Sequence, residues 1–170
     1  MSEYFGFRPV KSLAGGECRS NTYALLSSSQ QVFKGDLMIL DASGKVARAT
    51  SSATSTGPFL GAALENGPTT GTTADTIKVC DDPNAIYEAV SSSAVAATAY
   101  NLNYNAYVVD GSSTLKKSLS RIGASLAASV ATGVKVIGVV PRADNTAATA
   151  GQELLCVINS HSFKGGTAGI

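Results

Sequence analysis

Two groups of side chains in this sequence are of types that do chemistry in proteins. The first is the adjacent carboxylates Asp81 and Asp82, which could act as an acid–base pair or bind a cation. Adjacent strand residues point to opposite faces, however, and Pro83 and Asn84 follow directly. We therefore interpret this stretch as a turn capped by an Asp side chain, with a cation site as the alternative and catalysis as the least supported interpretation.

The second group is Cys156 and His161, which are close in the sequence. A thiol nucleophile needs an imidazole partner. Cys156 lies inside an apolar run, whereas His161 follows the end of that run, and nothing nearby offers an oxyanion hole or a third, orienting residue. We therefore predict that the protein is not an enzyme and uses no cofactor or small-molecule substrate. His161 is expected to make hydrogen bonds at the base of a C-terminal arm.

The cysteines also give no sign of a metal site or a disulfide framework. Cys18, Cys80 and Cys156 are odd in number, far apart, and without metal-ligand spacing. Cys80 and Cys156 each lie in an apolar stretch, where a thiol behaves as a small hydrophobic group. We predict no metal ligands and synthesis in a reducing cytoplasm.

Composition argues against several classes of partner. Only 15% of residues are charged, against about 25% in typical globular proteins, and the formal net charge is +1. Binding to nucleic acid needs a basic stripe, and Lys116–Lys117 is the only adjacent basic pair. No apolar run reaches the roughly 20 residues that cross a membrane, and the N-terminal residues do not resemble a secretion signal. A surface so poor in charge is expected to be covered by neighbouring subunits.

Hydrophobic patterning predicts an all-β domain. Short β-branched and apolar runs alternate with tracts of Ser, Thr, Ala, Gly and Asn, and residues 76–80 alternate with a period of two. This pattern predicts a single sandwich or barrel, of jelly-roll or related topology, over residues 31–162, with extended arms at 1–30 and 163–170. The strands are expected at 32–40, 45–50, 59–64, 76–80, 86–90, 104–109, 114–120, 135–140 and 153–159, with a polar loop at 51–56 and a short helix permitted between 123 and 133.

The two arms carry the residues that we expect to contact other proteins. Aromatic residues and Arg are common at the energetic centres of interfaces. The candidates are Tyr4, Phe5, Phe7, Arg8, His161, Phe163 and Lys164. Two alternatives stay open for the N-terminal group: a stacking platform for single-stranded nucleic acid, or a segment packed on its own domain.

Several stretches of the chain resemble one family of virion proteins. They are Phe5-Gly6-Phe7-Arg8-Pro9-Val10, Val79-Cys80-Asp81-Asp82-Pro83-Asn84, residues 135–145 and 157–161, and the final Gly169-Ile170. In this order they are similar to head decoration, or cement, proteins of tailed bacteriophages. The resemblance implies a β-rich domain bound to the outside of an icosahedral shell, often as a homotrimer at threefold positions, with the major capsid protein as its partner.

Together these observations predict a non-enzymatic virion protein that bridges neighbouring capsid subunits and stabilises the DNA-filled head. It would be made in the host cytoplasm and located on the outer capsid surface. The alternatives are another virion structural protein (tail, head-completion or head fibre) and a carbohydrate-binding β-sandwich module. The last would require exposed aromatic residues, for which the candidates are Tyr87, Tyr100, Tyr104 and Tyr107.

Overall fold

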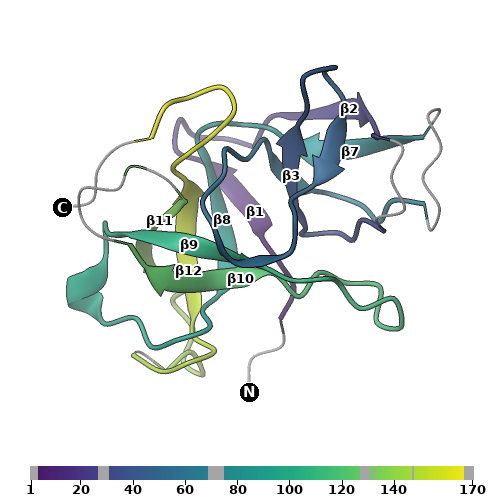
Figure 1. The fold of residues 1–170 in the computed structure, drawn as a ribbon. Helices are drawn as coiled ribbons and strands as arrows, with labels where there is room; N and C mark the ends of the chain where they lie inside the picture. Colours follow the sequence, from purple (N-terminus) through teal and green to yellow (C-terminus); the bar gives the residue numbers. More distant parts are fainter. Residues whose placement is uncertain are drawn as a thin grey trace.

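The computed structural model shows two antiparallel β-sheets that pack as a sandwich, which confirms the all-β prediction (Figure 1). It describes residues 4–26, 31–68, 75–126, 131, 133–146 and 148–166, without the side chains of Ala53 and Thr54. Within these ranges the only helical element is a 3₁₀ turn, Ala97–Ala99. None of the described helices is long and apolar enough to cross a membrane.

The larger sheet has seven strands in the order β1-β8-β12-β11-β9-β10, and β5 also pairs with β9. Its inward residues are aligned across the central strands, since Tyr87 is opposite Cys156, and Cys156 is opposite Val136. All three are buried, so Cys156 acts as the small hydrophobic residue that the sequence predicts. The strands are β1 (Arg8–Ser12), β5 (Ser52–Ser55), β8 (Ala85–Val90), β9 (Asn103–Val108), β10 (Arg121–Ser125), β11 (Val134–Val139) and β12 (Glu153–Ile158).

The smaller sheet has five strands in the order β2-β7-β6-β3-β4 and carries buried side chains on both of its faces. One face packs on the larger sheet and the other covers a second core, because adjacent strand residues point to opposite faces. A bridge between Leu25 and Val46 brings the two edges of this sheet together around the second core. The strands are β2 (Ser20–Ala24), β3 (Leu37–Leu40), β4 (Val46–Arg48), β6 (Gly61–Ala63) and β7 (Thr76–Cys80).

The prediction of an N-terminal arm over residues 1–30 is wrong for most of that segment. β1 pairs with β8 in the larger sheet, and β2 pairs with β7 in the smaller one. Phe7 is fully buried in the core between them. These strands lack clear alternation because β1 and β2 lie at sheet edges and bury few side chains, so their conformation depends on pairing.

Three further expectations need correction. Residues 52–55 of the predicted polar loop form β5, and residues 114–120 form a loop closed by a bridge between Ser112 and Lys117. β9 pairs with the next strand, β10, so residues 123–125 are strand rather than helix. Most of the remaining helix prediction, 127–130 and 132, lies outside the described residues.

The C-terminal arm is described only as far as residue 166. The carbonyl of Lys164 accepts a hydrogen bond from the backbone N–H of His161, at 3.2 Å. The first residues of the predicted arm therefore turn back on the domain.

Candidate functional site

The first surface cluster joins the start of the chain to β9 and β10. The guanidinium of Arg121 lies between two aromatic rings, 4.5 Å from the centroid of Tyr4 and 4.3 Å from that of Tyr107. The guanidinium of Arg8 lies 4.9 Å from the ring centroid of Phe5. Such cation–π contacts hold the aromatic side chains in place at the surface. Tyr4, Phe5 and Arg8 thus lie on the domain rather than on a free arm.

Phe7 does not belong to this surface, because its side chain is completely buried. Its backbone N–H donates to the carbonyl of Gly35, at 2.8 Å. The interface role expected for Phe7 is therefore wrong. Its side chain packs in the core and holds the N-terminal segment on the domain.

A chain of charged residues, not foreseen from the sequence, continues from Arg8 across the larger sheet. Arg8 pairs with Glu88 on β8, and Arg142 pairs with Glu153 on β12. Burial alone would raise the pKa of Glu88, but its hydrogen bond from Arg8 holds that pKa below the usual value. Burial and the neighbouring Glu88 raise the pKa of Glu153. These carboxylates meet only because β8 and β12 are neighbours, so no local pattern could have revealed them.

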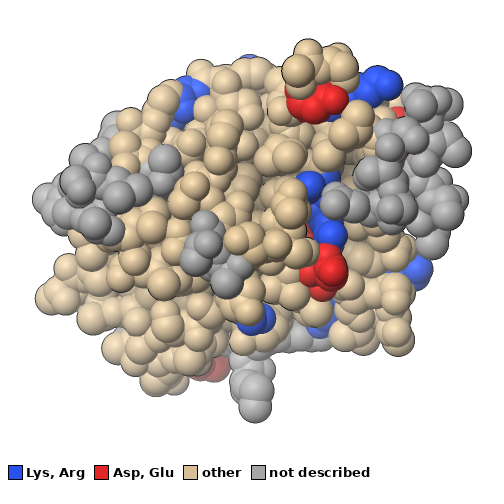
Figure 2. Space-filling view, in the orientation of Figure 1, with Lys and Arg blue, Asp and Glu red and all other residues tan. Residues whose placement is uncertain are grey.

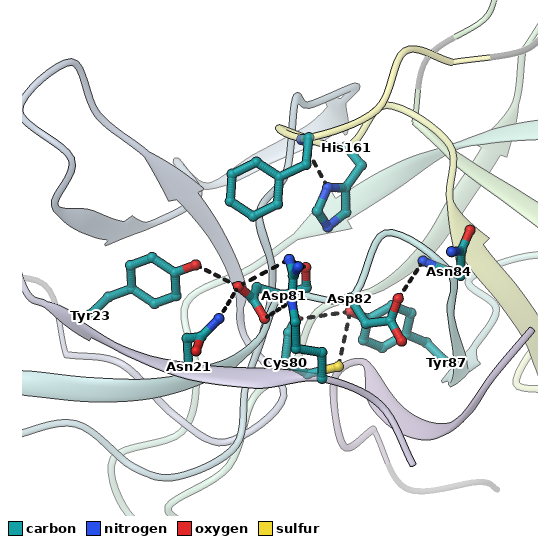
Figure 3. A network of polar contacts seen from close by, with 10 residues as sticks. Asn21, Tyr23, Cys80, Asp81, Asp82, Asn84, Tyr87 and His161 are labelled. Carbon is teal, nitrogen blue, oxygen red and sulfur yellow. Dashed lines mark hydrogen bonds and ion pairs between the residues drawn. The ribbon is translucent and has the colours of Figure 1, made fainter. Parts of the chain in front are cut away.

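The second cluster surrounds the carboxylate of Asp81 (Figure 3). Asp81 accepts hydrogen bonds from Tyr23 Oη at 2.6 Å, from Asn21 Nδ2 at 2.8 Å and from Arg19 Nε at 3.1 Å. Its side chain is only 1% exposed. Burial would raise the pKa of Asp81, but the donors, led by Tyr23, hold it below the usual value. The partners come from β2 and the residue before it, and the pairing of β2 with β7 places all three beside the end of β7.

Asp82 has the turn role that the sequence predicts. Its Oδ1 accepts the backbone N–H of Asn84, at 2.8 Å. The cation-site alternative has little support, since three protein donors already occupy the Asp81 carboxylate. Among the described residues, no group of three or more His, Cys, Asp or Glu side chains could hold a metal ion.

The C-terminal candidates lie beside the Asp81 cluster. The guanidinium of Arg19 is 5.4 Å from the ring centroid of Phe163, and the rings of His161 and Phe163 are 5.6 Å apart. Lys164 Nζ donates to the carbonyl of Pro83, at 3.0 Å. Phe163 and Lys164 are exposed, so they can meet a partner.

His161 is a structural residue beneath this surface. The residue is only 4% exposed. Its Nδ1 accepts a hydrogen bond from the backbone N–H of Phe163, at 3.1 Å. The proton of the neutral ring is therefore on Nε2. Burial and the charge of Lys164 lower its pKa from 6.5 to about 4. Cys156 is fully buried and burial raises its pKa, which disfavours the thiolate that a nucleophile requires.

Large apolar side chains on β1 and directly after it form a third surface feature. Val10 is 52% exposed and Leu13 is 57% exposed. The pairing of β1 with β8 shifts between Pro9 and Lys11, so Val10 is the extra residue of a β-bulge at a sheet edge. A bulge of this kind redirects a side chain away from the regular pleat.

The face shown in Figure 2 is mainly uncharged, with acidic and basic side chains in a few small groups.

The comparisons with known proteins assign no family. No protein-family model matches the chain, and no curated protein matches it.

Proposed function

We propose that this protein is a virion structural protein of the capsid-cement type, which binds the outer shell and bridges neighbouring major capsid subunits. The observation that carries the proposal is the exposure of Val10, within an edge strand, and of Leu13, directly after it. Large apolar side chains exposed at a sheet edge are typical of protein–protein contacts. The resemblance of the sequence to phage decoration proteins supports the choice of partner.

The proposed mechanism is additive. A specific contact normally buries about 1,000 Å² or more, and each copy would bury such an area across a subunit boundary. Association as a homotrimer would multiply the attachment points, so that modest single contacts become tight through effective concentration. Binding to the mature shell alone would stabilise it by about 2.7 kcal/mol per site at a hundredfold excess over Kd.

A loading assay tests the proposal directly. Shells stripped of the protein are incubated with the wild type, with Val10→Ser or with Leu13→Ser. Leu115→Ser, in the loop between β9 and β10, is a control of similar exposure. We expect the first two substitutions to reduce the bound copies per shell and the control to bind normally. Shells that take up no wild-type protein would refute the cement function, and equal loading of all three variants would refute the role of the β1 surface.

Two further measurements separate the alternatives. Mass-spectrometric counting against the major capsid protein distinguishes a cement protein, present in many copies, from a tail or head-completion protein, present in few. Sedimentation equilibrium at micromolar concentration tests the homotrimer. The carbohydrate-binding alternative has less support, because Tyr87 and Tyr104 are buried and cannot form an exposed platform.

A further inference from the structure

A basic cavity lies beside the first aromatic–cation cluster, where four segments distant in the sequence meet. Its volume is about 240 Å³. It is lined by Phe5, Phe7, Arg8, Pro9, Lys34, Gly35, Ala63, Lys116 and Lys117. Four of these nine residues are Arg or Lys and none is acidic, although charges nearly balance in the chain as a whole. The cavity therefore prefers an anionic occupant.

Lys34 and Lys116 supply the exposed positive charge of this cavity. Both residues are exposed. Arg8, in contrast, is already paired with Glu88. The two lysines are the groups that an incoming anion would meet.

The backbone holds the two lysine-bearing loops in fixed positions. Gly35, next to Lys34, has φ +90°, and a Cβ there would lie 2.4 Å from the carbonyl oxygen of Phe5. Lys116 has φ 52°, an uncommon conformation for a non-glycine residue, in a loop closed by the bridge between Ser112 and Lys117. The N–H of Ser118 donates to the carbonyl of Lys34, at 3.4 Å, which ties the loops together. This rigidity lowers the cost of ordering the site on binding.

The remaining lining residues indicate what kind of anion fits. Phe5 and Pro9 are partly exposed and apolar, so the cavity can also take an apolar side chain. Nucleic acid fits less well. A phosphate backbone is bound by basic residues arranged along a stripe, whereas the basic residues here are gathered in one cavity. An acidic peptide segment with neighbouring apolar residues matches both the positive charge of the lysines and the apolar surface of Phe5 and Pro9.

We propose that this cavity docks an acidic segment of a partner protein, with a carboxylate paired to Lys34 and Lys116 and an apolar side chain against Phe5 and Pro9. The proposal does not depend on the virion function. It would hold for any partner that offers such a segment.

The test uses a fluorescent hexapeptide of alternating Glu and Leu, a matched Gln–Leu peptide and a hexathymidine oligonucleotide. Anisotropy gives Kd, and NMR of ¹⁵N-labelled protein locates the contacts. We expect the Glu–Leu peptide to bind and to shift the amides of Lys34, Gly35 and Lys116. Lys34→Gln and Lys116→Gln should each weaken binding by about 1.5- to 5-fold, the range for exposed charge pairs. Added salt should also weaken it.

Lys78→Gln is the matched control, since Lys78 is an exposed lysine on β7 outside the cavity. It should leave the affinity unchanged. Three results would overturn the proposal: no binding of the Glu–Leu peptide, equal binding of the Gln–Leu peptide, or equal weakening by all three substitutions. Tighter binding of hexathymidine than of the Glu–Leu peptide would also overturn it, in favour of a nucleic-acid site. If the wild-type protein bound the Glu–Leu peptide but did not load onto stripped shells, only the cement function would be contradicted.

Discussion

Protonation of His161, the only histidine in the chain, should destabilise the fold in mildly acidic solution. The imidazole is buried, and its Nδ1 is occupied by the N–H of Phe163. A proton on Nδ1 would break this bond and place a charge in a poorly solvated position beside Lys164. The folded protein therefore keeps the ring neutral.

The magnitude follows from the two pKa values. In the unfolded chain His161 has the ordinary pKa of 6.5, and in the folded protein the pKa is about 4. Between these values the unfolded chain binds the proton more readily, so the free energy of unfolding falls as the pH is lowered through this window. The full loss is about 3 kcal/mol, because a tenfold difference in proton affinity between the two states is worth about 1.4 kcal/mol. Above pH 6.5 the contribution is fully present.

The opposite behaviour of Asp36 makes a difference measurement necessary. Burial raises the pKa of Asp36 from 3.8 to about 6, so its titration favours the folded state as the pH falls through an overlapping window. Comparison of the wild type with His161→Asn removes this effect, because both proteins contain Asp36. Asn also places an acceptor near the position of Nδ1.

Urea unfolding followed by circular dichroism from about pH 7 to about pH 4 gives the difference curve. The wild type should lose up to about 3 kcal/mol relative to His161→Asn across this range. An NMR titration of the single imidazole should give a pKa of about 4 in the folded protein. A flat difference curve, or an imidazole that titrates at its ordinary pKa of 6.5, would refute the reasoning.

Three substitutions test other parts of the fold, each by urea unfolding. Asp81→Asn should lower the free energy of unfolding by about 1–3 kcal/mol at neutral pH. The difference from the wild type should shrink in acid, because the wild-type carboxylate becomes protonated once the pH falls through its lowered pKa. A difference that does not change with pH would contradict an ionised Asp81. Cys156→Ser should cost about 1–2 kcal/mol of core stability, whereas loss of a binding activity alone would indicate a functional thiol. Gly61→Ala should lower the free energy of unfolding by about 3 kcal/mol or more, because the added Cβ would lie 1.7 Å from the carbonyl oxygen of Cys80. A variant as stable as the wild type would mean that β6 can shift to make room.

Local patterns predicted the central strands and one turn. The strands predicted at 76–80, 86–90 and 153–159 correspond to β7, to most of β8, and to β12, which ends at residue 158. Burial of β-branched and apolar side chains favours strands wherever the sheet forms. The turn after β7 was also predictable, since Asp82 caps a backbone N–H only two residues away. Burial of Cys80 and Cys156 followed from their apolar neighbours.

The surfaces could not be predicted in this way, because they depend on contacts between distant segments. Arg8 and Glu88 are 80 residues apart, and Asp81 meets its partners only through the pairing of β2 with β7. The sequence indicated that aromatic and basic residues near the N-terminus would be used, but sheet pairing turned the expected arm into two edge strands and buried Phe7. The basic cavity exists because the loops that carry Lys34 and Lys116 converge on that segment. Composition and periodicity determine the central, buried strands. Strand pairing decides the edge strands β1 and β2 and which side chains meet, since the pairing energy is shared among residues far apart in the chain.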